Sequence, residues 1–246
     1  MIRSRAFHFT LPFVFLFILA ANAQQPEKKS EFDIYQYKPT PRDRIIFEVN
    51  HTGWLNMPHG LRETATSGGV NFQLFFDKPI GYSRFSFAWG AGISSHNIHG
   101  KINLVALSDT STGNTNFTAI EIREKPYRIN RIGFKVLEVP VEFRFRTRTN
   151  YQFKIMAGFK VGYVVQTFRK IFDTDGKAKL YDIYGANPWR YGLILRVGWE
   201  QVHISMFYAL SEVFEQGKGQ KGIIPFSIGF AYTPRLSLGS GSNPVE

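Results

Sequence analysis

Eight segments of the chain alternate large apolar residues with small or polar ones, at a period of two residues. They span residues 45–55, 69–77, 82–95, 132–146, 150–167, 189–199, 202–211 and 223–232. The connections between them are short and long in turn: 78–81, 147–149 and 200–201 are short, whereas 56–68, 96–131, 168–188 and 212–222 are longer. Because a period of two is that of a β-strand, the chain is predicted to be all-β.

The residue types on the two faces of these segments indicate what surrounds them. In the third segment Phe85, Phe87 and Trp89 alternate with Ser86 and Gly90. A face exposed to water would be rich in Lys, Glu and Thr, whereas a face of small residues suits the crowded interior of a narrow barrel. The large residues are then expected to face lipid. We predict an eight-stranded antiparallel up-and-down transmembrane β-barrel with short periplasmic turns and longer outer loops. A soluble periplasmic barrel is the alternative.

The N-terminal residues have the composition of an export signal. Arg3 and Arg5 precede an apolar stretch that ends at Ala21-Asn22-Ala23, a small-residue cleavage site. The predicted organisation is a signal peptide (1–23), a polar periplasmic lead-in (24–44), the barrel (45–233) and a flexible tail (234–246). An even strand count leaves both ends of the barrel in the periplasm, so the cell outer membrane is the expected location.

The charge of the chain indicates which partners to expect. The formal net charge of +11 falls to +9 without residues 1–23, which carry two arginines and no acid. Export argues against nucleic acid as a partner, so outer-membrane lipid, including lipopolysaccharide phosphate, and other envelope proteins are the expected partners. Lipid A phosphate contacts are predicted from the basic residues of the outer loops, which are Arg169, Lys170, Lys177, Lys179, Lys218 and Lys221. The absence of Cys excludes disulfides and a lipoprotein anchor.

Charged residues also occur on the predicted inner face of the strands. They are Glu48, Glu138, Glu142, Arg144, Arg146, Lys154, Lys160, Arg190 and Arg196. We expect them to fill the lumen with mutual ion pairs, because eight strands leave an interior that side chains occupy. Opposed residues share a face, and opposite charges stabilise such pairs. The fourth and fifth segments are therefore predicted to pair Glu142 with Lys154 and Arg144 with Gln152.

Three strand sequences carry a family resemblance. They are Leu137-Glu138-Val139-Pro140-Val141, Gly158-Phe159-Lys160-Val161-Gly162-Tyr163 and Phe226-Ser227-Ile228-Gly229-Phe230. The first resembles the (L/Y)-(D/E)-(I/V)-P-(L/V) strand of PorT-like outer-membrane β-barrel proteins of Bacteroidota, and the others look like later strands of that family. The resemblance implies an eight-stranded outer-membrane barrel; PorT itself is an accessory of type IX secretion and gliding machinery. The tail from Pro234 to Glu246 departs from the family, which usually finishes near the last strand.

One pattern is similar to a catalytic site. His203 and Ser205 lie two apart on a strand, which places both side chains on one face, and Glu212 and Glu215 follow downstream. The lipid A deacylase barrel has a comparable His-x-Ser pair. The predicted position of His203 beside a periplasmic turn and facing inward argues against catalysis on lipid, so these are interpreted as lumen residues.

Two patterns have some of the features of metal sites. His51, His59, His96 and His99 lie near the predicted outer rim, but their spacing places them on different faces. The stretch Asp173-Thr174-Asp175-Gly176 is half of a calcium loop without its later acidic positions. Ordinary loop and turn residues are the simpler interpretation, so no metal or cofactor is predicted.

The sequence thus favours a non-enzymatic outer-membrane barrel with a structural or interaction role, such as that of an accessory of a secretion or envelope assembly. A lipid A-modifying enzyme in the barrel wall and a small passive channel are the alternatives.

Overall fold

The computed structural model describes residues 44–61, 63–108, 115–147 and 151–234, which all belong to one compact unit, Lys38–Glu246. These residues form eleven β-strands: β1 (Ile45–Leu55), β2 (Gly68–Pro79), β3 (Phe85–His99), β4 (Ile102–Ser108), β5 (Thr115–Ile122), β6 (Tyr127–Arg146), β7 (Phe153–Asp173), β8 (Gly176–Tyr181), β9 (Trp189–Trp199), β10 (Val202–Ala209) and β11 (Ile224–Tyr232). The signal peptide, nearly all of the lead-in and almost all of the tail lie outside the described residues.

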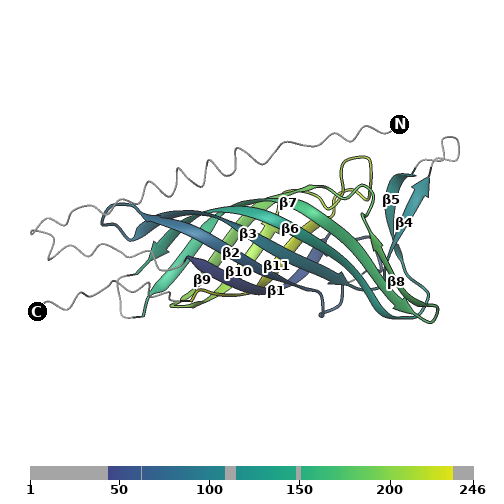
Figure 1. Cartoon of the computed structure of the whole chain (residues 1–246), viewed down its shortest axis with the longest axis horizontal. Helices are drawn as coiled ribbons and strands as arrows, with labels where there is room; N and C mark the ends of the chain where they lie inside the picture. The colour runs from purple at the N-terminus through teal and green to yellow at the C-terminus, as the bar shows by residue number, and fades with distance from the viewer. Residues whose placement is uncertain (1–43, 62, 109–114, 148–150, 235–246) are drawn as a thin grey trace, which may run out of the picture. The chain divides into compact units, whose positions relative to one another are not determined.

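Eight of the strands close into an antiparallel barrel (Figure 1). Their order is β6-β3-β2-β1-β11-β10-β9-β7, and pairing of β6 with β7 closes the ring. β8 adds to the outer part of β7, and β4 and β5 form a separate two-stranded sheet. The predicted fold class is therefore confirmed. No helix in the described part of the chain is long and apolar enough to cross a membrane.

The two faces of the barrel wall differ as the alternation predicts. Val49 and Phe230 on the outer face are each 67% exposed, whereas Arg196 and Glu142 on the inner face are 0% and 1% exposed. Small residues on the inner face let the wall curve tightly: a Cβ atom at Gly158 in β7 would overlap the carbonyl oxygen of Val141 in β6. Large residues thus face lipid and the charged residues fill the lumen.

Two of the predicted loops contain regular structure. The segment 96–131 holds the β4–β5 hairpin and the beginning of β6, and the segment 168–188 holds the end of β7 and all of β8. Two strands of the barrel, β6 and β7, therefore continue past the wall as paired strands (Figure 1). A register shift beside Lys135 marks the start of this extension, and a bulge of this kind bends the strands and increases their twist.

The predicted register of β6 and β7 is wrong. Glu142 is opposite Gly158, Arg144 is opposite Met156, and Arg146 is opposite Lys154. The turn is longer than predicted, because Thr147 N donates to Phe153 O (3.0 Å) and strand pairing begins at residue 153 instead of 150. Opposed side chains do not select the register, because the charged groups of a narrow lumen find partners across it.

An apolar cluster occupies the outer half of the lumen. Trp54, Phe134 and Phe214 belong to it, and the Trp54 and Phe134 rings meet edge to face at 6.1 Å. Its other buried members are Leu61, Ile98, Ile102, Ile120, Ile132, Val136, Val213 and Ile223. Several of these come from the outer connections, so the loops fold back over the mouth and pack it with side chains instead of leaving it open.

Candidate functional site

The centre of the lumen is organised around Arg196 of β9. Its Nε donates to Glu48 Oε1 (2.5 Å), Nη1 donates to Glu142, and Nη2 donates to Gln73 Oε1 (2.6 Å). Glu48 also accepts hydrogen bonds from Ser205 Oγ (2.6 Å) and Asn71 Nδ2 (2.5 Å). One guanidinium therefore joins side chains from β1, β2, β6 and β9, and both carboxylates are compensated by charge and by hydrogen bonds.

A second group of ion pairs lies toward the end of the lumen where β6 finishes. Arg144 Nη2 lies 2.7 Å from Glu142 Oε2, and its Nη1 lies 3.6 Å from Asp77 Oδ2. Arg146 pairs with the same Asp77 and donates to Ser86 Oγ (3.1 Å). Asp77 is absent from the sequence-based set, although its alternation with Asn71 and Gln73 on β2 would have placed it on the inner face.

The remaining predicted lumen charges also lie inside the barrel. Lys160 Nζ lies 3.0 Å from Glu138 Oε2, and Ser94 Oγ donates to Glu138 Oε1 (2.8 Å). Arg190 lies over the Phe207 ring at 5.2 Å, and Lys154 donates to the carbonyl oxygen of Glu200 (2.6 Å). The nine charged residues proposed for the lumen thus all lie on the inner side. Together with the apolar cluster they fill the barrel along its length.

The catalytic pattern found in the sequence does not assemble. Ser205 and His203 are 6% and 1% exposed in the lumen, and the Ser205 hydroxyl is committed to Glu48. Glu212 accepts a hydrogen bond from Gly222 N (3.0 Å), and Glu215 pairs with Lys218, both in the outer connection that follows β10. The predicted inward orientation of His203 and Ser205 is confirmed, and these glutamates have other partners.

The two patterns with features of metal sites also have other partners. His96 Nδ1 lies 3.2 Å from Thr52 Oγ1 inside the barrel, whereas His99 is on the outer face. Asp173 and Asp175 pair with Arg123 and Lys125, and the hydrogen bond from Lys125 lowers the pKa of Asp175. Within the described ranges no group of three or more His, Cys, Asp or Glu side chains is placed to hold a metal ion.

The six basic residues proposed for lipid A phosphate separate into three environments. Lys170, Lys177 and Lys179 lie on the outer face of β7 and β8. Lys218 pairs with Glu215, which raises the pKa of Lys218, and Lys221 is exposed in the same connection. Arg169 faces the opposite way: it is 7% exposed and donates to Leu104 O (3.2 Å) and Asn103 Oδ1 (2.7 Å). Its expected lipid contact is therefore wrong, because it holds the β4–β5 hairpin.

Four further basic residues share the outer side of the extended strands and were not among the predicted phosphate contacts. His99, Arg128 and Arg131 lie beside Lys170, Lys177 and Lys179, and Lys135 is exposed just above the lipid-facing Leu137. We use the name basic outer face for a group of six basic and three aromatic residues. They are His99, Arg128, Arg131, Lys170, Lys177 and Lys179 with Phe168, Phe172 and Tyr181. The odd-numbered residues of β6 face outward, and this pattern would have predicted Arg131 and Lys135 on the outer side. The bulge in β7 changes which residues of that strand face outward, so its alternation does not extend to Lys170.

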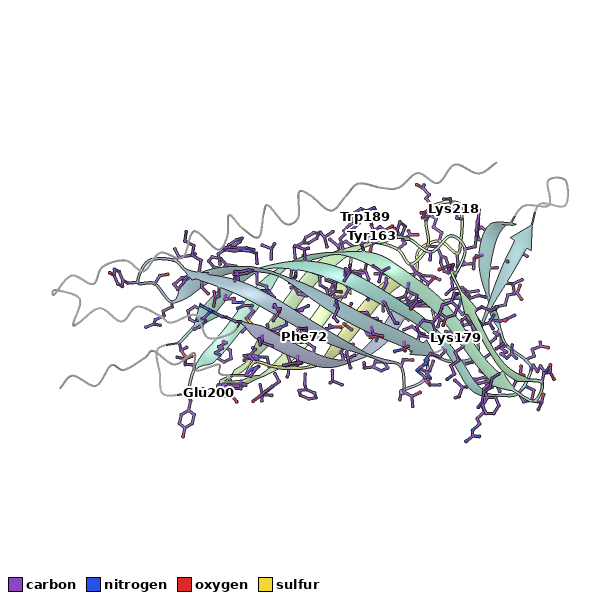
Figure 2. The ribbon with its side chains drawn as sticks, in the orientation of Figure 1. Phe72, Tyr163, Lys179, Trp189, Glu200 and Lys218 are labelled. Carbon is purple, nitrogen blue, oxygen red and sulfur yellow. The ribbon has the colours of Figure 1, made fainter. Side chains whose placement is uncertain are left out.

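The two ends of the barrel are distinguished by their connections. Figure 2 shows Lys179 and Lys218 at one end and Glu200, in a two-residue turn, at the other. Tyr163 and Trp189 lie between them, and their rings are 5.3 Å apart on the outward face of the wall. Short turns are periplasmic and aromatic girdles mark the membrane boundaries, so Lys179 and Lys218 belong to the outer end.

Comparison with known proteins finds similar solved structures and a matching family. The chain is similar to Ail, the attachment invasion locus protein of Yersinia pestis, at 12% identity and a TM-score of 0.33 over 77% of this chain and 95% of that one. A second Ail structure, in complex with the heparin analogue sucrose octasulfate, gives 12% identity and a TM-score of 0.31 over 77% and 96%. No curated protein matches the sequence. Residues 29–215 match the family described as "Outer membrane protein beta-barrel domain", and the chain belongs to that family of the outer membrane.

Proposed function

We propose that this barrel is a non-enzymatic interaction protein of the outer membrane, which contacts its partners through its outer end. The filled lumen carries the proposal. Charged groups such as Arg196 and Glu142 are fully buried against one another, and an apolar cluster closes the outer half. A filled lumen favours an interaction role over conduction or catalysis inside the barrel, and the extended strands and the β4–β5 hairpin present a large paired surface outside.

The partners proposed for this surface are lipopolysaccharide of the outer leaflet and other envelope proteins. The resemblance to PorT-like proteins suggests, more narrowly, an accessory of a secretion or envelope assembly. Support for contact with lipopolysaccharide comes from the basic residues at the outer end, since cations there can neutralise the anionic groups of the leaflet.

The protein extracted from its own membrane in mild detergent is expected to run as a species much heavier than one barrel with its detergent. The reason is that a closed barrel with an extended outer surface acts by binding other chains. Native mass is the measurement, and identification of the co-purifying chains names the assembly. A control without residues 101–123, which removes the β4–β5 hairpin, should be lighter. A lone monomer in both cases would contradict the assembly role.

Lipid A is expected to have the same mass in cells with and without the protein. Ser205 is buried in the lumen and donates to Glu48, so its hydroxyl is not presented to lipid. Mass spectrometry of extracted lipid A is the measurement. A loss of one acyl chain that depends on the protein and disappears in Ser205→Ala would contradict the non-enzymatic role.

A further inference from the structure

Four basic residues stand side by side across four strands of the basic outer face. His99 of β3 is opposite Arg131 of β6, Arg131 is opposite Lys170 of β7, and Lys170 is opposite Lys179 of β8. His99 and Arg131 keep the outward parity of the lipid-facing wall, and Lys170 and Lys179 share their side of the sheet because each is directly opposite its neighbour in the row. The row unites residues from three distant parts of the sequence, since Lys170 and Lys179 belong to one hairpin, and it contains no acidic residue.

This row is unfavourable to the isolated protein. Like charges directly opposite one another on neighbouring strands are destabilising. Within the described ranges no carboxylate forms an ion pair with Arg131, Lys170 or Lys179, whereas Arg123 and Lys125 on the same outer extension are both paired. Three adjacent cations without a carboxylate partner on one sheet face are the arrangement that an anionic ligand would stabilise.

Aromatic rings lie beneath these cations. Arg131 Cζ and Lys179 Nζ are 5.6 and 5.0 Å from the centre of the Phe168 ring, and Lys179 Nζ is also 4.6 Å from that of Tyr181. One strand step farther out, Arg128 and Lys177 lie 5.5 and 5.1 Å from the Phe172 ring. Such contacts restrain flexible basic side chains without neutralising their charge, so the face is held ready for an anion.

The height of the row separates it from the lipid A phosphates. Lys170 follows Tyr163 of the outer aromatic girdle by seven residues along β7. At about 3.3 Å per residue and a tilt near 45°, this places Lys170 roughly 16 Å beyond the girdle. Lys135 is opposite Gln166, much closer to the girdle. Lys135 is therefore at the level of lipid phosphate, and the row is at the level of the sugars above it.

We propose that the basic outer face binds the anionic oligosaccharide of a neighbouring lipopolysaccharide molecule, with Arg131, Lys170 and Lys179 receiving its phosphate or carboxylate groups. The face follows the lipid-facing wall along β6 and β7, beyond the register shift beside Lys135, so a lipopolysaccharide molecule whose acyl chains pack on that wall carries its sugars toward this surface. Phe168 is covered by the cations, but Tyr181 is 51% exposed beside Lys179 and offers a ring face on which a sugar ring can stack. The inference rests on the proposed contact with the outer leaflet and names its site.

The test compares Lys170→Glu with Lys101→Glu, at an exposed lysine between β3 and β4, in the full-length protein in detergent. Both variants make the same change of charge at an outer lysine, but only Lys170 is in the row. Binding of purified rough lipopolysaccharide is expected to weaken about tenfold or more in Lys170→Glu, because a charge-assisted contact is replaced by repulsion. Lys101→Glu should bind as the unchanged protein does. The ligand-free Lys170→Glu protein should unfold at a higher temperature, since the introduced carboxylate would pair with Arg131 on one side and Lys179 on the other.

The probes separate the possible sources of the anion. Lipid A prepared from the same lipopolysaccharide by mild acid hydrolysis should bind equally to the unchanged protein and to Lys170→Glu. The Lys135→Glu variant should bind both lipopolysaccharide and lipid A more weakly. Equal loss of lipid A binding in Lys170→Glu would overturn the assignment to sugars. Unchanged lipopolysaccharide binding in Lys170→Glu would overturn the site itself, while a heavy native assembly would leave the proposed function intact.

Discussion

Replacing Arg196 with methionine should lower the free energy of unfolding by about 3–5 kcal/mol. Arg196 is fully buried and donates to Glu48, Glu142 and Gln73. Methionine fills a similar length of the lumen, but it leaves Glu48 without its ion-pair partner and Glu142 with Arg144 alone. The cost of an uncompensated buried charge is larger than the net contribution of the ion pair itself, so the single substitution is severe.

Urea titration of the barrel in detergent, followed by the loss of its heat-modifiable gel mobility, measures this change. Arg84→Met, at an exposed position in the turn between β2 and β3, is the matched control and should change the free energy by less than about 0.5 kcal/mol. Adding Glu48→Gln to Arg196→Met should restore part of the loss, because it removes one uncompensated carboxylate. Additive effects of the two substitutions would show instead that the two groups are not coupled.

The strand faces were predictable because alternation is a local property. Every second residue of β9 from Arg190 to Arg196 is inward, and this parity follows from the sequence without any knowledge of neighbours. The same reasoning located the nine lumen charges. It did not give their partners: Arg196 joins Glu48 of β1 and Glu142 of β6, strands that are not next to β9 in the barrel. Such pairs depend on closure of the ring and on side-chain reach across it.

The outer end was less predictable because the outward parity of β7 and the alignment of β6 with β7 both depend on features outside the local sequence. A bulge opposite Lys135 reverses which residues of β7 face outward. Beyond the bulge Arg169 therefore faces inward and Lys170 faces outward. Register also depends on the length of a turn, and an error of a few residues at 147–152 displaced every predicted β6–β7 pair. The row of His99, Arg131, Lys170 and Lys179 requires three registers to be correct at once, so no pattern in the sequence reveals it.

Replacing Leu195 with arginine should lower the free energy of unfolding in lipid by about 2–4 kcal/mol. Leu195 is on the outward face of β9, between Trp189 and Trp199, which are themselves 54% and 62% exposed on the same face. These two tryptophans mark opposite boundaries of the apolar belt, so Leu195 lies near its middle. An arginine there must remain in hydrocarbon or reach far to a boundary, and its desolvation is not compensated by any partner on this face.

The depth dependence of this cost is the informative measurement. Val202→Arg makes a comparable change on the outward face of β10 beside the turn at Glu200, and it should cost only about 0–1 kcal/mol near the interface. Reversible guanidinium unfolding of the protein in lipid vesicles compares the two. Equal costs at Leu195 and Val202 would contradict the placement of the belt, because water or detergent around the barrel treats both exposed positions alike, whereas a bilayer distinguishes its centre from its edge.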